Sequence, residues 1–151
     1  MQFENLAALK AHIGKPLAST EWITVTQTMI NDFAEATMDK QWIHVDVERA
    51  KKESPFGKTI AHGFMSVAMA SKFVEEALSI KSVKMGLNYG LNKVRFPHPV
   101  PVDARLRMHP TVAEVEDYGD NGAKVMFDIV IEIEGVEKPA CAGQFIILLF
   151  E

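Results

Sequence analysis

The sequence predicts an α+β fold in which an antiparallel β-sheet wraps around one long apolar helix. Signals for helices gather in the first half of the chain and signals for strands in the second half. The helix expected from Ala61 to Ser79 has almost no polar face in its first half, and such a helix must be buried on all sides. Residues 124–134 alternate apolar and polar side chains, as half-buried strands do. A sheet curled around the helix satisfies both patterns.

Three shorter helices are expected before the apolar one. They run from Phe3 to His12, from Thr26 to about Thr37 and from Asp46 to Glu53. Thr26 and Asp46 are the candidate N-caps of the second and third helices. Asp39 therefore lies just past a helix end. Its spacing of five residues from His44 does not suit one face of a helix but does suit a turn that folds back.

Four segments of the second half carry strand signals: they open at Val94 and at Asp103, cover residues 124–134, and end with residues 140–150. Gly-containing pairs at residues 121–122 and 134–135 supply hairpin turns. After Pro110 the inward-facing phase is expected to shift onto Ala113 and Val115. This shift predicts a bulge that curves the strand.

Length and composition limit the class of protein. A chain of 151 residues is expected to form one domain over residues 1–151, because a chain of that size buries about 68–70% of its unfolded surface without metals or disulfides. The single cysteine and the polar, acidic N-terminus favour a reducing cytoplasm. No apolar run approaches the roughly 18 residues of a membrane span, so we expect a soluble protein. The net charge of −4 without a basic block argues against a nucleic-acid partner.

The candidate site combines Asp39, His44 and Gly63. A carboxylate and an imidazole at the mouth of an apolar pocket can share one water molecule. A helix that begins beside them, at Ala61-His62-Gly63, can stabilise negative charge on a carbonyl oxygen through its free N–H groups. Together these groups predict the addition of water to an activated double bond.

Residues 39–46 (Asp-Lys-Gln-Trp-Ile-His-Val-Asp), 59–64 (Thr-Ile-Ala-His-Gly-Phe) and 87–96 (Leu-Asn-Tyr-Gly-Leu-Asn-Lys-Val-Arg-Phe) resemble the MaoC-like hydratase family, in particular its NodN-like branch. The resemblance implies a hot-dog fold, a homodimer with its active site at the subunit interface, and no cofactor. It also implies (R)-specific hydration of trans-2-enoyl-CoA to (3R)-hydroxyacyl-CoA. The family's catalytic Asp falls on Asp39, its catalytic His on His44, and its oxyanion-hole glycine on Gly63.

Two positions depart from the family pattern. Family members often have Gly before the catalytic Asp and Asn-Pro between the Asp and the His, where this chain has Met38 and Gln41-Trp42. The Gln-Trp-Ile-His version favours the NodN-like branch. If the turn requires a positive φ, Met38 adopts it with strain. A serine that some relatives carry on the central helix has no clear counterpart, and we assign no role to Ser66.

The sequence leaves open which of Asp39 and His44 is the acid and which the base. A neutral imidazole suits a base near pH 7, whereas an acid role for Asp39 requires apolar surroundings, which Trp42 and Phe64 are expected to supply as substrate-binding residues. Lys93 and Arg95 are the better candidates for the CoA phosphates, although solvated charges are the simpler reading.

His62 is expected to be structural, with its ring holding the loop before the helix in place, and a catalytic role stays open as the less favoured alternative. A metal site built from Asp39, His44, Asp46 and His62 matches no common zinc spacing, so we expect no bound metal. Two other functions stay open, because a fold alone does not decide function. One is a hot-dog acyl-CoA thioesterase, and the other is a non-catalytic acyl-binding protein with a regulatory or assembly role.

Overall fold

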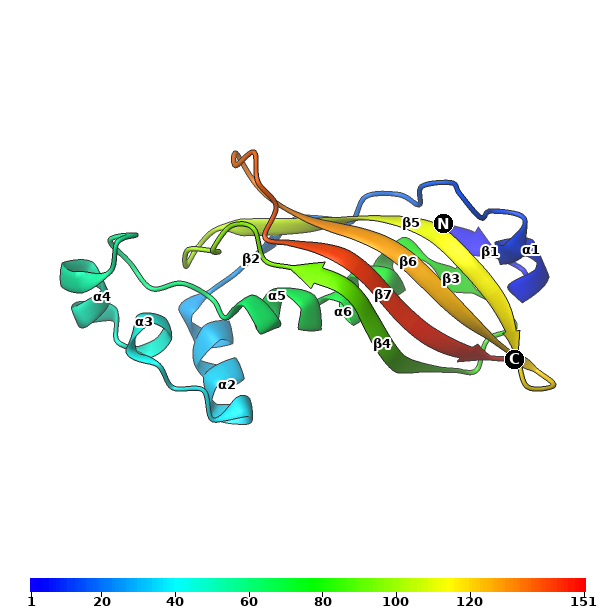
Figure 1. Ribbon diagram of the computed structural model, residues 1–151, viewed down its shortest axis with the longest axis horizontal. Coiled ribbons are helices and arrows are strands. Elements are labelled where there is room, and N and C mark those ends of the chain that lie inside the picture. The colour runs from blue at the N-terminus through cyan, green and yellow to red at the C-terminus, as the bar shows by residue number, and fades with distance from the viewer.

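A computed structural model describes residues 1–151. Its main sheet is antiparallel and has the strand order β2-β5-β6-β7-β4. The strands are β2 (Ile23–Thr24), β4 (Met85–Arg95), β5 (Arg105–Tyr118), β6 (Gly122–Ile133) and β7 (Cys141–Phe150). The sheet curls over the helices α5 (Gly63–Ala68) and α6 (Ala70–Ala77), as Figure 1 shows. The predicted α+β class, with an antiparallel sheet wrapped around a central helix, is confirmed.

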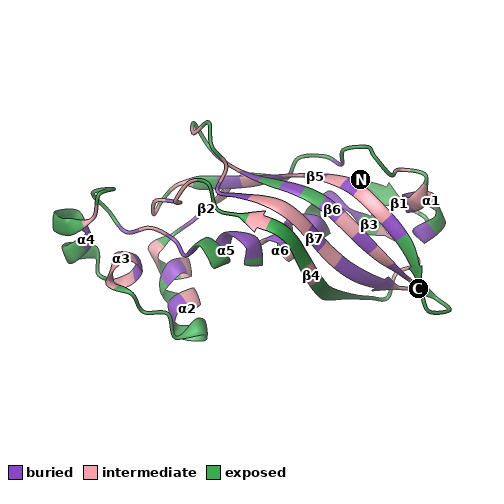
Figure 2. Cartoon of the chain, viewed as in Figure 1, coloured by how far each residue is buried: buried purple, intermediate pink, exposed green.

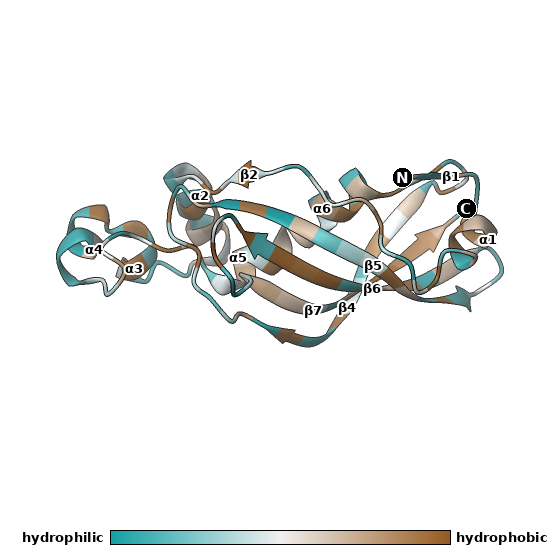
Figure 3. Cartoon of the chain, turned by 90° about the horizontal axis from the view of Figure 1, so that it is seen from above, coloured by the Kyte–Doolittle hydropathy of each residue, from teal (hydrophilic) through white to brown (hydrophobic).

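The core lies between the sheet and the central helices. The inward-facing side chains of β6 are each at most 1% exposed: Val125, Phe127, Ile129, Ile131 and Ile133. Phe73 of α6 is fully buried in the same cluster. The predicted alternation along residues 124–134 is therefore confirmed, and Figure 3 shows similar alternating bands along β5. This apolar cluster fixes the central helix beneath the sheet.

The central helix differs from the prediction in two ways. It begins at Gly63, and Met69, with φ −71° and ψ −11°, divides it into α5 and α6. It is also not buried on all sides, because the sheet covers only one face: Gly63, Phe64 and Ala68 are exposed, and Phe64 is 71% exposed. Figure 2 shows this mixture of buried and exposed residues along α5. The uncovered face borders the candidate site.

Two strand predictions need correction. β4 begins at Met85 and not at Val94, so Asn88 and Asn92 lie within the strand. Asn and Gly residues are rare in strands, and they concealed β4 in the sequence. The predicted bulge exists, but the register shifts between Val112 and Glu114, so Val112 and not Ala113 faces the core.

The N-terminus is partly extended where a helix was predicted. β1 (Gln2–Phe3) pairs in parallel with β3 (Ser79–Ile80). The helix α1 (Leu6–Lys10) starts only after Asn5, whose side-chain oxygen accepts a hydrogen bond from the Ala8 amide at 2.9 Å. An N-cap therefore ends the extended segment and begins the helix.

Three helices lie together at one end of the sheet in Figure 1: α2 (Gln27–Thr37), α3 (Trp42–Val45) and α4 (Val47–Glu53). Both predicted N-caps are confirmed. Thr26 accepts from the Met29 amide at 3.2 Å, and Asp46 accepts from the Arg49 amide at 2.9 Å. α3 is a single turn that the sequence did not predict. Asp39 follows α2, and His44 lies on α3. None of the helices combines the length and the apolar character that crossing a bilayer requires.

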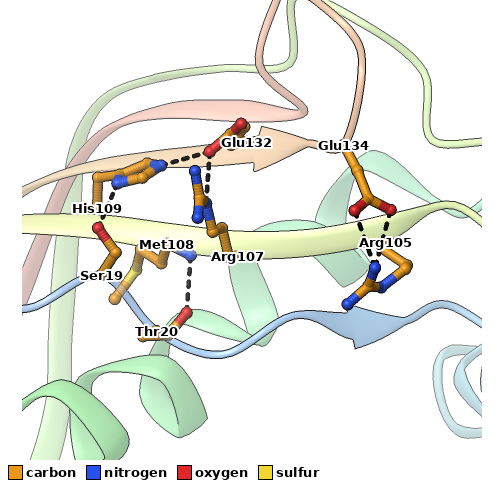
Figure 4. Close-up of polar contacts among 8 residues, drawn as sticks. All are labelled: Ser19, Thr20, Arg105, Arg107, Met108, His109, Glu132 and Glu134. Atoms are coloured by element: carbon orange, nitrogen blue, oxygen red, sulfur yellow. Dashed lines mark hydrogen bonds and ion pairs between the residues drawn. The ribbon is translucent and has the colours of Figure 1, made fainter.

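A polar network holds the segment before β2 alongside β5, at the edge of the sheet (Figure 4). Ser19 Oγ lies 2.8 Å from His109 Nδ1, and His109 Nε2 lies 2.6 Å from Glu132. Arg107 donates to the same carboxylate at 2.7 Å, while the Met108 amide donates to Thr20 Oγ1 at 2.9 Å. The network links β5, β6 and residues 19–20 on the side of the sheet that faces away from the core.

Candidate active site

The ends of three helices bring the candidate residues together. Asp39 lies after the C-cap of α2, where Met38 has a φ of 61°. His44 projects from α3, and His62 directly precedes α5. One side-chain ligand atom each from Asp39, His44 and His62 lies within 4.8 Å of the others. The structure thus brings the predicted pair together and adds His62 to it.

Hydrogen bonds fix the tautomer and the orientation of His44. Its Nδ1 lies 2.7 Å from the carbonyl oxygen of Ile60. Because a carbonyl oxygen only accepts, Nδ1 carries the proton and the Nε2 of the neutral ring holds a free lone pair. Gln27 Nε2 donates to the His44 carbonyl at 2.8 Å, which ties α3 to the first turn of α2. The ring is 7% exposed and presents an acceptor nitrogen.

Burial holds the pKa of His44 below its ordinary value of 6.5, and the neighbouring His62 ring lowers it as well. The hydrogen bond to Ile60 and the charge of Asp39 raise the pKa but do not outweigh burial. A buried imidazole is costly to charge because it has lost part of its hydration. The lowered pKa of His44 favours the neutral imidazole at pH 7.

Asp39 is the more open member of the pair. Its side chain is 57% exposed, and its Oδ2 lies 3.9 Å from His62 Nε2. The Gln41 amide approaches Oδ1 only at 3.5 Å. Phe64 lines the same cavity as Asp39, and Trp42 does not. Within one chain the expected apolar surroundings therefore cover the carboxyl group only in part, and it is open to a ligand or a water molecule.

Gly63 is the first residue of α5, and its amide donates to no acceptor within the chain, as is usual for the first turn of a helix. A Cβ added at Gly63 would lie 3.0 Å from two ring carbons of Phe96. A side chain at this position therefore meets the Phe96 ring first.

A cavity of about 590 Å³, here called the main cavity, opens beside these groups. Asp39, His44, Gly63 and Phe64 all line it. Its remaining wall is largely apolar and comes from α2, α5, β4 and β7, with Phe33, Val67, Leu91 and Phe145 among its residues. An adjoining cavity of about 230 Å³ shares Ser71, Asn88 and Phe145 with the main one. The two cavities follow the central helix from Gly63 toward Leu78.

Three predicted binding residues do not line either cavity. The Trp42 ring lies under the guanidinium group of Arg49, 4.3 Å from its central carbon. Lys93 sits in a bulge of β4 with a φ of 52°, and Arg95 donates to the Val94 carbonyl at 2.8 Å. Trp42 thus packs on α4, while Lys93 and Arg95 are exposed at the end of an edge strand.

Several residues of the site were missed in the sequence. Gln27 also accepts from Thr59 Oγ1 at 2.5 Å, so it joins α2 to the segment before α5. Tyr89 lines the main cavity from β4, next to Asn88. Only the recognition of β4 as a strand beside the helix could have placed Tyr89.

The group of Asp39, His44 and His62 fits a metal ion poorly. The rings of His44 and His62 are stacked, with centroids 3.8 Å apart and planes inclined by 25°. An ion bound by both rings must lie in both ring planes, and nearly parallel planes do not meet within bonding distance of the nitrogens. Asp46, which also entered the predicted set, caps α4 instead.

The chain is similar in sequence to known proteins over most of its length. Residues 8–132 match the protein family described as MaoC like domain. The chain is 46% identical over 145 residues to the 3-hydroxyacyl-thioester dehydratase Z of Mycobacterium tuberculosis, over 96% of this chain and 95% of that protein. It is 41% identical over 146 residues to nodulation protein N of Rhizobium leguminosarum, over 96% and 91% of the two chains. The unliganded R-hydratase PhaJ1 of Pseudomonas aeruginosa shares the fold, with a TM-score of 0.76 and 22% identity over 97% of this chain and 86% of that one.

Proposed function

Because the chain belongs to the MaoC-like domain family, we propose that it is an (R)-specific enoyl-CoA hydratase, a hydro-lyase that reversibly adds water to trans-2-enoyl-CoA. The product is (3R)-hydroxyacyl-CoA. One observation carries the proposal most strongly: an imidazole with a free Nε2, an exposed carboxyl group and an unused helix N–H border the same largely apolar cavity. The similar mycobacterial protein is named a 3-hydroxyacyl-thioester dehydratase, and dehydration is the same reaction run backwards.

The reaction needs two proton carriers and one stabilised oxygen. His44 Nε2 takes a proton from water as the water oxygen bonds to C3 of the enoyl group. In the proposed complex the acyl chain and the second subunit cover the Asp39 carboxyl group and give it the apolar surroundings that an acid role requires. Asp39 then gives a proton to C2, and the electron pair of the double bond forms the new C–H bond. The imidazolium ion then returns a proton to Asp39 through solvent. The lowered pKa of His44 suits a base near pH 7.

The thioester carbonyl gathers negative charge as water adds to C3. In the proposed complex this oxygen accepts a hydrogen bond from the Gly63 amide at the N-terminus of α5. Such a donor stabilises developing charge without a side chain, and the aligned peptide dipoles of the helix favour an anion there. Gly63 and the pair of Asp39 and His44 then act on opposite ends of the conjugated system.

The cavities suggest where the substrate lies. The acyl chain is proposed to occupy the main cavity against Phe64 and to extend into the adjoining cavity toward Leu78. Lys93 and Arg95 lie outside both cavities, so they are proposed to bind the CoA phosphates at the surface. Trp42, the first residue of α3, holds the segment between Asp39 and His44 against α4 through its contact with Arg49. Its ring contacts the substrate only if it leaves Arg49.

A homodimer is part of the proposal. β4 is an edge strand of 11 residues whose apolar side chains Met85, Leu87, Tyr89 and Leu91 are each 45–56% exposed. An edge of that length and character is prone to pair with another strand. Two copies of β4 meeting about a twofold axis would cover these side chains and narrow the main cavity, which Tyr89 and Leu91 line.

The absorbance of the conjugated enoyl thioester tests the proposal. A hydratase removes this absorbance without releasing thiol, a thioesterase releases thiol, and a non-catalytic acyl-binding protein does neither. We expect loss of absorbance, no thiol, and the 3R enantiomer when crotonyl-, octenoyl- and dodecenoyl-CoA are compared. Thiol release, or no turnover of any of the three, would reject the proposal.

A further inference from the structure

We propose that His62 is a positioning residue for the hydration reaction: its ring holds both the turn that carries Asp39 and the plane of the His44 imidazole. This role rests on the proposed function, since it concerns the groups that move the protons. It goes beyond the purely structural part that the sequence suggested for His62.

The first support is a hydrogen bond between distant segments. His62 Nε2 lies 2.9 Å from the carbonyl oxygen of Asp39, so Nε2 carries the proton and donates it. The other hydrogen bonds of residues 38–41 stay within the α2–α3 segment, to Thr37, Glu35 and His44 or within the turn. His62 is therefore the single hydrogen-bonding link between this turn and the start of α5, where Gly63 follows.

The second support is the stacking of the two imidazoles. The His62 ring covers the His44 ring at a centroid distance of 3.8 Å, and it also contacts Phe33 of α2 at 5.0 Å. His44 is thus fixed at Nδ1 by Ile60 and across its face by His62. The lone pair on its other nitrogen, Nε2, therefore points in one fixed direction. A base held in one orientation needs less reorganisation when water attacks.

The third support is a cost that a purely structural residue would avoid. His62 is 4% exposed, and its Nδ1 has no hydrogen-bond partner within the chain. A buried polar atom without a partner destabilises the folded state. Phenylalanine would fill a similar space beside Phe33 without that cost. An imidazole at this position therefore lowers stability, a common trade-off at functional sites.

Electrostatics agree with this placement. The titratable groups that act on His44 are Asp39, from the turn after α2, and His62, from the segment before α5. His62 lowers the pKa of His44, which keeps the base neutral. Removal of the His62 imidazole should raise that pKa and move the acid limb of kcat/KM to higher pH.

Two substitutions separate the ring from its hydrogen bond. His62→Gln places an amide nitrogen near the position of Nε2 and keeps a donor for the Asp39 carbonyl, but it removes the ring. His62→Phe keeps the ring and removes the donor. His12→Phe, at a half-buried imidazole in the turn after α1 and outside both cavities, serves as the control. For each purified protein, kcat, KM, the pH dependence of kcat/KM and the melting temperature are measured with the same enoyl-CoA.

We expect His62→Phe to melt at or above the wild-type temperature and yet to lose about 10- to 100-fold in kcat, because small displacements of catalytic groups have effects of that size. His62→Gln should retain more of kcat. We expect the acid limb of the wild type below pH 6.5, because the pKa of His44 is lowered, and in both variants it should move to higher pH. The control should behave like the wild type.

A His62→Phe protein with wild-type kcat and an unmoved acid limb would overturn the positioning role. If that variant does not fold, an unmoved acid limb in His62→Gln has the same force. Failure of the proposed function is a different result, since the wild type itself would then not hydrate enoyl-CoA.

Discussion

Met38 shows at the residue scale what the local backbone demands. Its φ of 61° lies in the left-handed region, and its side chain is 83% exposed. A residue with a Cβ is strained there, while glycine is not. Glycine, which members of the family often have before their catalytic Asp, would adopt this φ without strain.

We predict that Met38→Gly raises the free energy of unfolding by up to about 1 kcal/mol, because it removes left-handed strain at an ordinary helix C-cap. Met38→Ala is the control, since alanine keeps the Cβ and therefore the strain. Urea unfolding of the three proteins measures the effect. A glycine variant less stable than the alanine variant would show that the turn is not strained.

Gly63 is the second residue whose backbone matters. We predict that Gly63→Val lowers kcat/KM by about 10²–10³-fold, the usual effect of losing one oxyanion donor. The valine side chain must displace Phe96, whose ring carbons lie 3.0 Å from an added Cβ, and the displacement moves the amide at the start of α5. Activity and melting temperature are measured on the same preparation.

Adding Phe96→Ala makes room for the valine and tests how the effect arises. Partial recovery of kcat/KM in the double variant indicates that the position of the amide is decisive. A Gly63→Val protein that melts and hydrates like the wild type would remove Gly63 from the site.

Some residues of the site could be predicted from the sequence, and others depend on the long-range fold. Asp39, His44 and Gly63 stand in short segments whose order along the chain carries the pattern, and the structure brings them to one cavity. The places of Trp42, Lys93 and Arg95 depend on which way side chains project. The Trp42 ring packs under Arg49 and outside the cavity, and Lys93 lies in a bulge with a positive φ. The sequence around these residues predicts neither arrangement.

At the scale of elements, the same contrast separates β6 from β4. β6 is buried on one face, so apolar and polar residues alternate and the sequence predicts it well. β4 is an edge strand that is exposed along most of its length, and its Asn and Gly residues weaken the signal. The break of the central helix at Met69 was not predictable either. An apolar run has the same sequence pattern in a continuous helix and in a helix interrupted at one residue.

The outer network of the sheet yields a prediction at this scale. Arg107 and then His109 lower the pKa of Glu132 through hydrogen bonds. A lowered carboxyl pKa stabilises the fold above the ordinary value of 4.5, and that stabilisation disappears as pH falls through the pKa of the folded state. Glu132→Gln should therefore reduce the melting temperature at pH 7, by the equivalent of about 1 kcal/mol or less for so exposed a group.

The difference between Glu132→Gln and the wild type should shrink below pH 4.5 and vanish as pH falls through the lower pKa that Glu132 has in the folded state. Glu134→Gln is the matched control, because Glu134 pairs with Arg105 alone. An equal loss in both variants at every pH would show that the link through His109 to Ser19 adds nothing to stability.

At the scale of the whole molecule, the exposed edge of β4 and the open carboxyl group of Asp39 point to a second chain. We predict a homodimer in light scattering, with twice the chain mass of 16.8 kDa. Met85→Lys places a charge on the β4 edge outside both cavities and should weaken the dimer and the activity together. Val130→Lys, at a similarly exposed residue on β6, should change neither. A fully active monomer would contradict this prediction.

The central claim is that Asp39 and His44 together move the protons of hydration, and one measurement tests it most directly. Asp39→Asn keeps the shape of the side chain but removes its ability to exchange a proton, and His44→Ala removes the other carrier. Turnover of enoyl-CoA is compared with the wild type, on protein shown to be folded by its melting temperature. We predict that each variant loses at least about 10²-fold in kcat with its fold intact, as general acids and bases usually do. A folded variant that keeps more than roughly a tenth of wild-type hydration, far above the residual rate of an enzyme without its acid or base, would contradict the account.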